Sequence, residues 1–417
     1  MMRLAVSSIR PPAWRVLLAG WAMAACALLA GCGGGVFAGV GSGGSGVAEG
    51  TLSGFGSVIV DGVEYSELAL ADADRSGLKL GQRLRLVFDA NNNAQSVEVR
   101  PQLRGPVTAA LDADGWSRIA GQWVRVVMDN DDISRSGITL LDGFGGTAIA
   151  AGQDAVAYGS WAWDPVKASQ VLIATRVERL ATPADPVLLG GVAMAVGDSG
   201  FRLNATNGTA VSATRMPAIG EGTIVSLQVA RSGLVADGQG AVAMLAALDV
   251  QDASLGAVDL SGYQTIRLGG LANRVDSTGG TVTIQGTTLR VAGGATGFSD
   301  GQFVRATAEG GTGSPGPADV RQRGRSPVGM PGDDGTGLVT ELKGLLAGVD
   351  WTAASVTFVL RGVTVQADAA QIAQACRSAG SSQTLYVVVT GYSPSPVAPL
   401  RANAVSCTSD LTAASDV

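Results

Sequence analysis

Four tryptophans lie between residues 116 and 163, and these are the residues best suited to hold a ligand. They are Trp116, Trp123, Trp161 and Trp163, and Tyr158 lies close to the last two. Trp161 and Trp163 are two residues apart, so on a β-strand their side chains fall on one face. Aromatic rings in such a row bind sugars, and they also fill protein cores. We therefore predict either a binding face or a buried aromatic cluster.

Acidic residues offer two further kinds of chemistry. Asp129, Asp131 and Asp132 cluster in the sequence MDNDDIS, and alternating carboxylates can bind Ca²⁺. The segment lacks the glycine and the bidentate glutamate of an EF-hand loop, so a solvated acidic loop is the preferred interpretation. Two carboxylates roughly 5–10 Å apart across a cleft could instead hydrolyse a glycosidic bond. The sequence does not show which of the 35 acidic residues would form that pair.

The chain contains no histidine, and this excludes several catalytic and metal-binding arrangements. A Ser-His-Asp triad, a histidine-activated cysteine and a histidine-ligated metal cannot form. The sequence GDSG at 197–200 is therefore interpreted as a turn rather than as part of a serine protease. No GxxxxGKS/T phosphate loop is present. We predict no catalytic residue, no metal ligand and no cofactor.

Residues 1–31 have the pattern of a lipoprotein signal peptide. Three arginines precede an apolar run, which ends in the sequence LAGC at Cys32. This ending resembles the bacterial lipobox, whose cysteine carries lipid; a transmembrane anchor is the alternative. The resemblance implies an outer-membrane protein of a Gram-negative bacterium, because Gly33 stands where aspartate would indicate inner-membrane retention. Residues 32–48 are predicted to form a glycine- and serine-rich tether.

The charge of the chain argues against nucleic acid as a partner. The formal net charge is −6, and loss of the three signal-peptide arginines leaves 26 basic against 35 acidic residues, a net charge of −9. Proteins that bind nucleic acids usually present basic surfaces. The expected partners are the membrane, through the N-terminal lipid, and a glycan or another envelope protein.

Two cysteines remain once the signal peptide is removed and Cys32 is lipidated. They are Cys376 and Cys407, both in the last segment of the chain. In an oxidising compartment they are expected to form a disulfide, and two separate buried thiols are the alternative.

Repeated strand patterns indicate what positions these residues. The sequence GTLSGFGSVIVDGVEY, from Gly50, combines alternating valines with an Asp-Gly turn, which predicts a β-hairpin. It is followed by LKLGQRLRL and AQSVEVR, and a similar order recurs along the chain. The predicted repeats are 49–101, 102–182, 186–252 and 263–324, then a linker at 325–337 and a fifth repeat at 338–410. The second and third repeats are the divergent copies.

These segments resemble domain of unknown function 5666, a bacterial family of exported proteins in which the domain often occurs in tandem. The three quoted segments of the first repeat carry the resemblance, and VTFVLRGVTVQAD and YVVVTG of the fifth repeat match more weakly. The resemblance implies an exported, repetitive architecture and no particular activity.

Each repeat supplies about five short strands with one apolar face, which predicts an all-β protein. Five such strands lose most of their exposed edges by curling into a barrel, and a barrel with a long first hairpin is close to the OB-fold. Flat sandwiches are the alternative. Helices are expected at 340–348 and at 369–380, where the second would plug a barrel between strands.

We therefore expect tandem small OB-like five-stranded β-barrels behind a lipoprotein signal peptide. Such a chain would be a structural or binding module of the cell envelope rather than an enzyme. The alternative is a carboxylate-based hydrolase acting on envelope glycans, which would need a deep pocket with two acidic side chains.

Overall fold

The computed structural model describes residues 45–128, 138–144, 149–311, 315–322, 340–379, 383–393 and 395–409. Every described residue belongs to one unit of the chain, Gly43–Val417. The predictions for Cys32, for the signal peptide, for the aspartates at 129–132 and for the linker at 325–337 lie outside the described residues.

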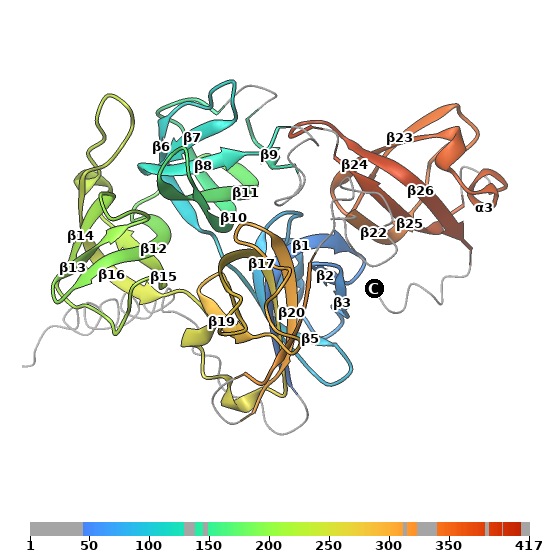
Figure 1. Cartoon of the computed structure of the whole chain (residues 1–417). Helices are drawn as coiled ribbons and strands as arrows, with labels where there is room; N and C mark the ends of the chain where they lie inside the picture. Colours follow the sequence, from blue (N-terminus) through green and yellow to red (C-terminus); the bar gives the residue numbers. More distant parts are fainter. Residues whose placement is uncertain are drawn as a thin grey trace, which may run out of the picture. The chain divides into compact units, whose positions relative to one another are not determined.

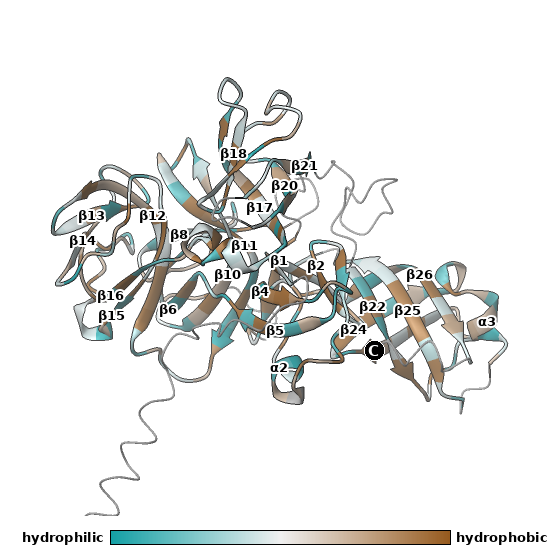
Figure 2. Ribbon diagram, turned by 90° about the horizontal axis from the view of Figure 1, so that it is seen from below, coloured by the Kyte–Doolittle hydropathy of each residue, from teal (hydrophilic) through white to brown (hydrophobic). Residues whose placement is uncertain are grey.

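Nearly all regular structure in the described chain is β-strand (Figure 1), as the sequence predicts. The α-helices of the described part are α2 (Asp72–Ser76) and α3 (Gln374–Arg377), and a few short 3₁₀ turns accompany them. Strands such as β26 (Leu400–Thr408) carry both apolar and polar residues (Figure 2). Buried and less buried residues alternate along β8 (Gln122–Val126), so one face of this strand is buried, whereas β1 (Gly46–Phe55) is buried along its whole length. The all-β prediction is confirmed.

The strands of barrel 1 (46–99) show how each repeat closes. They are β1 (Gly46–Phe55), β2 (Val58–Val60), β3 (Val63–Tyr65), β4 (Arg83–Phe88) and β5 (Ala94–Val99). Strand β1 pairs with β2 and β4, β2 pairs with β3, and β4 pairs with β5, all antiparallel. A parallel bridge from Ser66 to Asn93 joins the ends of β3 and β5. The closed order β1-β2-β3-β5-β4 is that of an OB-type barrel.

Four more five-stranded repeats follow. Barrel 2 (103–180) contains β6 (Leu103–Ala109), β7 (Trp116–Ile119), β8 (Gln122–Val126), β10 (Asp154–Asp164) and β11 (Ser169–Leu180), with an additional strand β9 (Leu140–Asp142). Barrel 3 (187–252) contains β12 (Val187–Gly197), β13 (Gly200–Leu203), β14 (Thr209–Ala213), β15 (Ile224–Val229) and β16 (Met244–Asp252). Barrel 4 (265–322) contains β17 (Thr265–Asp276), β18 (Thr281–Ile284), β19 (Thr287–Arg290), β20 (Phe303–Glu309) and β21 (Ala318–Gln322). Barrel 5 (340–408) contains β22 (Thr340–Leu346), β23 (Ser355–Leu360), β24 (Val363–Asp368), β25 (Leu385–Tyr392) and β26 (Leu400–Thr408).

Barrels 2, 3 and 4 repeat the strand order of barrel 1. In each of them the third strand meets the fifth in parallel. These pairs are β8 with β11 in barrel 2 and β14 with β16 in barrel 3, and in barrel 4 a bridge from Val291 to Ala318 takes the place of a ladder. Barrel 5 has the parallel β24–β26 pair, but in the described part of the chain β22 and β23 share no ladder, so this barrel stays open. The two divergent repeats therefore have the same topology as the others. Each barrel lies within three residues of its predicted range.

The turn between the second and third strands explains the Asp-Gly pattern that predicts the first hairpin. Asp61 and Gly62 both have positive φ angles, 50° and 77°, which the tight type I′ hairpin turn requires. Each of the corresponding turns in barrels 2, 4 and 5 also has a residue of positive φ followed by a glycine. They are Ala120-Gly121, Gln285-Gly286 and Arg361-Gly362.

Two expectations about local structure are corrected. The sequence predicts a helix at 340–348, but Thr340–Leu346 is strand β22, because all seven of its residues pair with β25 and this pairing outweighs helix propensity. The predicted tether at 32–48 extends too far, since Gly46–Ala48 already belong to β1 and pair with both β4 and β17. In the region 369–380, a 3₁₀ turn (Ala369–Gln371) precedes the short helix α3.

Barrels that are distant in the sequence are joined directly. Gly46–Glu49 of β1 pairs in parallel with Thr265–Leu268 of β17, so barrel 1 continues into barrel 4. Apolar side chains of barrels 2 and 3 likewise form one continuous core cluster. The repeats are therefore packed against one another and do not form a simple string in which only sequence neighbours touch.

A buried ion-pair network lies where barrel 1 meets barrel 4. Arg83 Nη2 donates to Glu49 Oε1 at 2.8 Å, and Arg85 Nε donates to Glu49 Oε2 at 2.9 Å. Arg83 Nη1 also donates to the carbonyl oxygen of Gly269 in barrel 4, at 3.1 Å. Burial raises the pKa of Glu49, but Arg85 and Arg83 outweigh that effect and hold the pKa at about 2. We call Glu49, Arg83 and Arg85 the buried charge network.

Cys376 of α3 and Cys407 of β26 are joined by a disulfide, with their Cα atoms 5.1 Å apart. These are the two cysteines for which a disulfide is predicted from the sequence. The bond ties α3, which lies between the third and fourth strands of barrel 5, to the last strand of that barrel. The disulfide therefore belongs to barrel 5, the barrel that the strand ladders do not close.

Candidate functional site

The five aromatic residues singled out from the sequence do not form one face. Trp161 is fully buried, with 0% of its surface exposed, and its Nε1 donates to Gln102 Oε1 at 3.1 Å. Tyr158 is also buried, and this burial raises the pKa of its hydroxyl to about 12. Trp163 is 48% exposed and is the penultimate residue of β10. The core alternative therefore holds for Trp161 and Tyr158.

Trp116 and Trp123 are brought together by the hairpin of β7 and β8. In the antiparallel register, Trp116 lies opposite Arg125 and Arg118 lies opposite Trp123. Side chains alternate along a strand, so these four point to one face, while Ser117, Ile119, Val124 and Val126 are buried on the other. The outer face of the hairpin is thus a two-by-two arrangement of tryptophan and arginine.

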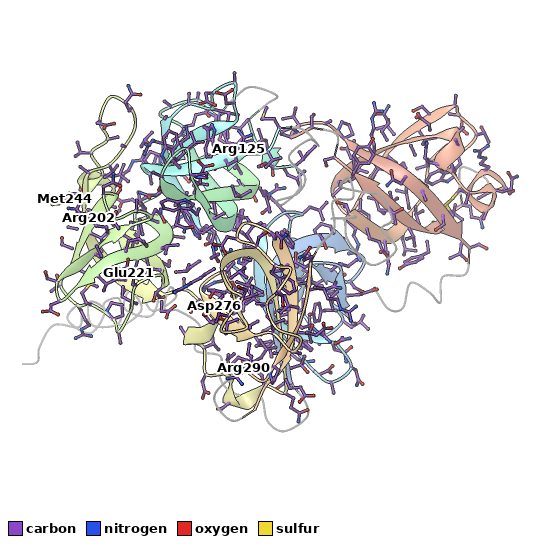
Figure 3. The ribbon with its side chains drawn as sticks, in the orientation of Figure 1. Arg125, Arg202, Glu221, Met244, Asp276 and Arg290 are labelled. Atoms are coloured by element: carbon purple, nitrogen blue, oxygen red, sulfur yellow. A yellow bond between two sulfur atoms is a disulfide. The ribbon has the colours of Figure 1, made fainter. Side chains whose placement is uncertain are left out.

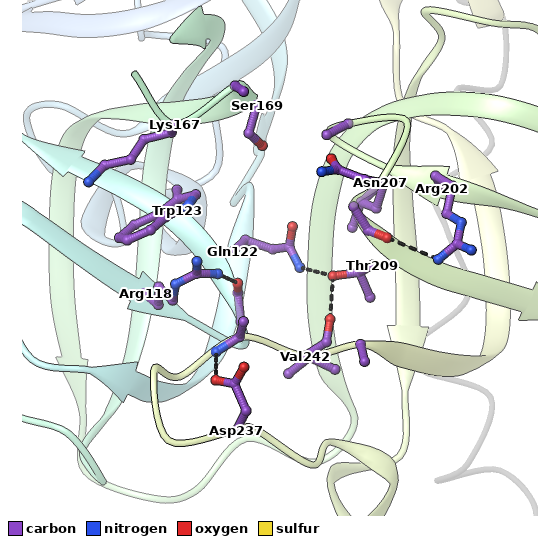
Figure 4. Close-up of a pocket in the computed structure, with 17 residues that line it drawn as sticks. Arg118, Gln122, Trp123, Lys167, Ser169, Arg202, Asn207, Thr209, Asp237 and Val242 are labelled. Atoms are coloured by element: carbon purple, nitrogen blue, oxygen red, sulfur yellow. Dashed lines mark hydrogen bonds between the residues drawn. The ribbon is translucent and has the colours of Figure 1, made fainter. Parts of the chain in front are cut away.

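Cations cover the indole rings of this hairpin. The guanidinium carbon of Arg118 lies 3.7 Å from the ring centroid of Trp123, and that of Arg125 lies 5.2 Å from the Trp116 centroid. Lys167 Nζ lies 4.2 Å from the Trp123 centroid and 4.7 Å from the Trp116 centroid. Such contacts each contribute about 0.5–2 kcal/mol. Because Trp123 lies between Lys167 and Arg118 (Figure 4), its ring faces are already occupied by side chains of the protein.

Lys167 is held in place by the turn between β10 and β11. The carboxylate of Asp164 accepts hydrogen bonds from the backbone N–H groups of Lys167 and Val166, at 2.8 and 2.9 Å. In an OB-type barrel, the loop between the fourth and fifth strands and the face of the second and third strands are the parts that bind oligosaccharides and oligonucleotides. The Trp–Arg hairpin and Lys167 occupy these two places in barrel 2.

A cavity of about 330 Å³ lies beside Trp123, between barrel 2 and barrel 3 (Figure 4). Its charged and amide-bearing lining residues include Arg118 and Lys167 from barrel 2 and Arg202, Asn207 and Asp237 from barrel 3. Figure 3 labels Arg202 on β13 of barrel 3 and Arg125 on β8 of barrel 2. Because the lining residues come from both barrels, barrels 2 and 3 contribute to one site.

A hydrogen-bond network fixes the two walls of this cavity. Gln122 Nε2 donates to Thr209 Oγ1 at 3.3 Å, and Asn204 Nδ2 donates to Gln122 Oε1 at 2.8 Å. Thr209 Oγ1 in turn donates to the carbonyl oxygen of Val242 at 2.7 Å. Gln122, Asn204 and Thr209 are all buried. Because the network crosses from barrel 2 to barrel 3, the cavity walls are held in a fixed relation.

The cavity carries an excess of positive charge. Within the described residues, none of Arg118, Lys167 and Arg202 forms an ion pair, and the cavity contains one acidic residue, Asp237. Asp237 accepts backbone hydrogen bonds from Ala241 and Gln239, and these lower its pKa. Three cations therefore face one carboxylate in a chain whose net charge is negative.

Arg118 is the most constrained of the three cations. Its Nη1 donates to the carbonyl oxygen of Gly121 at 2.7 Å, while its Nε is buried and has no hydrogen-bond partner among the described residues. Burial lowers the pKa of the guanidinium, although the group stays charged at every physiological pH. A buried, charged donor without an acceptor favours an incoming acceptor group.

Two other cavities do not combine these properties. One of about 530 Å³ is lined by Lys79 and Asp142, which form a 3.0 Å ion pair with each other, and one of about 450 Å³ lies on barrel 5 beside Asp368 and Arg401. Each of the three cavities contains one acidic residue, so none shows the carboxylate pair that the predicted hydrolase would need. In the described ranges, no group of three or more Asp, Glu, Cys or His residues could hold a metal ion. The same ranges contain no helix of the length and apolarity needed to cross a membrane.

The sequence interpretation missed the cations of the site. Trp-x-Arg occurs twice, at Trp116–Arg118 and at Trp123–Arg125, once on each arm of one hairpin. That repetition could have indicated the Trp–Arg face. Nothing in the sequence connects Arg202 with Trp123, because these residues are brought together only by the packing of two barrels.

Comparisons with known proteins add little to this description. No family model matches the chain, and no curated protein matches it. Among solved structures, the chain is similar to one titled "drosophila Unr CSD456", with 13% identity over 44% of this chain and 83% of that chain. The TM-score is 0.13, so this likeness carries no argument about the fold or the function. The resemblance to domain of unknown function 5666 stays a prediction.

Proposed function

We propose that this protein is a lipid-anchored component of the cell envelope whose OB-type barrels bind a glycan. The proposed anchor is Cys32, on the basis of the lipobox-like LAGC, and the proposed location is the outer membrane of a Gram-negative bacterium. A disulfide between Cys376 and Cys407 is compatible with an oxidising compartment outside the cytoplasm.

One observation carries the binding part of the proposal. The second and third strands of barrel 2 and its loop between strands four and five line a cavity with tryptophan, arginine and lysine side chains. These are the parts of an OB-type barrel that contact oligosaccharides and oligonucleotides. The negative net charge of the chain disfavours a polyanionic nucleic acid, which leaves a glycan as the ligand class that this site supports best.

The test is retention of the full-length protein, purified in detergent, on isolated peptidoglycan and on envelope polysaccharide. We expect the wild type to be retained and the Arg118→Ala/Lys167→Ala double variant to bind at least about tenfold more weakly, since two charged contacts are lost. Arg290→Ala is the matched control, because Arg290 is exposed on β19, the third strand of barrel 4. Equal retention of all three proteins would contradict the proposal. Release of reducing sugar during the incubation would instead favour the hydrolase.

The anchoring part of the proposal has its own test. Cys32→Ala should leave the protein out of the membrane fraction, because the acyl chains would have no attachment site. Recovery of this variant in the membrane pellet at the level of the wild type would contradict the lipid anchor and leave the glycan-binding test unaffected.

A further inference from the structure

We infer that the cavity between barrels 2 and 3 selects a sugar that carries a carboxylate group. The inference rests on the proposed glycan binding and names the ligand class at that same site.

The first step of the argument is the charge of the cavity walls. Arg118 and Lys167 approach from barrel 2 and Arg202 approaches from barrel 3, and in the described part of the chain none of them is paired with a carboxylate. The single acid, Asp237, is engaged by two backbone N–H groups. A neutral ligand would leave the excess of positive charge uncompensated, whereas a carboxylate would offset it, and arginine suits a planar carboxylate by geometry.

The second step concerns the indole rings. Neutral sugars are commonly held by stacking on a free aromatic face. The faces of Trp123 are occupied by Arg118 and Lys167, at 3.7 and 4.2 Å from the ring centroid. A neutral sugar would have to displace a favourable cation–aromatic contact, but an anion can contact the same cations while they remain on the ring. We therefore expect a ligand to be recognised through the cations of the cavity rather than by stacking on a free indole face.

The third step is the size and polarity of the cavity. At about 330 Å³ it lies at the small end of ligand pockets, which span about 300–1,000 Å³. One or two sugar rings fit such a volume better than a long stretch of polymer. The side chains of Asn207 and Ser169 line it and can exchange hydrogen bonds with sugar hydroxyl groups. Charges more than a Debye length of about 8 Å from the cavity are largely screened. The acidic residues elsewhere on the protein therefore have little effect on a single bound anionic group, and the cations of the cavity dominate its electrostatic interaction.

The experiment compares a carboxylated sugar with its neutral ester. Tryptophan fluorescence of the full-length protein in detergent is titrated with digalacturonic acid and with its methyl ester, which keeps the same rings and hydroxyl groups. We expect the acid to bind at least about tenfold more tightly than the ester, and its affinity to fall as salt is raised.

Variants assign the selectivity to the cavity. Lys167→Gln and Arg202→Gln should each weaken binding of the acid by about tenfold and leave binding of the ester unchanged. Both side chains lie outside the buried core, so both variants are expected to fold. Lys167→Arg should restore the affinity for the acid, and Arg290→Gln is the control with a charge removed from another barrel.

Each outcome bears on the inference. Equal affinity for acid and ester would overturn it while leaving the proposed glycan binding intact. Retention on peptidoglycan without binding of digalacturonic acid would overturn the carboxylated-sugar class. Tighter binding of a single-stranded oligonucleotide than of the acid would overturn the inference and identify nucleic acid as the ligand class. Failure to bind any glycan would contradict the proposed function as well.

Discussion

Two groups of charged residues at barrel junctions differ in one respect, whether their cations form ion pairs with a carboxylate. In the buried charge network between barrels 1 and 4, Arg83 and Arg85 each form an ion pair with Glu49. At the junction of barrels 2 and 3, Arg118 and Lys167 contact the ring of Trp123 and form no ion pair in the described part of the chain. Buried arginines that share a carboxylate fix a packing arrangement, whereas a cavity whose cations form no ion pair is suited to an anionic ligand.

The largest effect on stability should come from removing the carboxylate of the buried charge network. Glu49→Gln leaves Arg83 and Arg85 buried without their anion and should lower the free energy of unfolding by about 3–5 kcal/mol. Urea denaturation measures it. Glu98→Gln is the matched control, because Glu98 forms a partly exposed ion pair with Arg100 and should cost at most about 1 kcal/mol. Similar losses in both variants would show that the network does not fix the junction.

Removal of the aromatic residue from the core of barrel 2 should have a comparable effect. Trp161→Ala should cost about 3–5 kcal/mol, because the side chain is fully buried. Trp163→Ala, two residues further along β10, should change the stability by no more than about 0.5 kcal/mol, since its ring is half exposed. Thermal melting of the two single variants separates the positions. Equal shifts would contradict the assignment of Trp161 to the core and of Trp163 to the surface.

Barrel 5 offers a third comparison, because it alone among the described barrels combines an incomplete strand ladder with a disulfide. Replacing both Cys376 and Cys407 by serine should destabilise this barrel by about 3–4 kcal/mol on the chain-entropy estimate for a separation of 31 residues. Hydrogen exchange resolves the effect by barrel, and protection should fall in β24–β26 but not in barrel 2. Unchanged exchange throughout barrel 5 would exclude a stabilising role for the disulfide.

The pH dependence of stability should follow Glu49. Its pKa is about 2 in the folded protein and 4.5 in an unperturbed glutamate, so the ionised form favours folding. The contribution, at most about 3 kcal/mol, is present above pH 4.5 and is lost as the pH falls toward 2. Urea titrations of the wild type and Glu49→Gln across this range should show a steeper loss in the wild type. Parallel curves would contradict the assignment.

A small effect on stability is expected at the cavity between barrels 2 and 3. Lys167→Gln should change the free energy of unfolding by no more than about 1 kcal/mol, because the lysine has cation–aromatic contacts and no ion pair in the described structure. Denaturant melts beside the binding titration show whether stability and affinity separate. A loss of stability as large as that of Glu49→Gln would make this cluster structural too.

Local patterns predicted much of the fold, and long-range packing accounts for most of what they missed. Asp61-Gly62 and the alternating valines around it indicate a hairpin because turn geometry and burial depend on neighbouring residues. Trp161 and Trp163 alternate identically, so no local rule distinguishes the buried ring from the exposed one. The segment at 340–346 has helix-forming residues, and only its pairing with β25 makes it a strand. The cavity needs Arg202 and Lys167 from two barrels, which the sequence does not connect.

The pairing of β1 also has a mechanical consequence. If Cys32 holds the protein to a membrane, a pull on the body enters the described chain at Ser45 and reaches β1 at its first residue, Gly46. Strand β1 is aligned with β4 over six residue pairs and with β17 over four. A force along β1 would load these hydrogen bonds in shear, so they would have to break together rather than one after another. The strand that joins barrels 1 and 4 would then also be the one that bears tension.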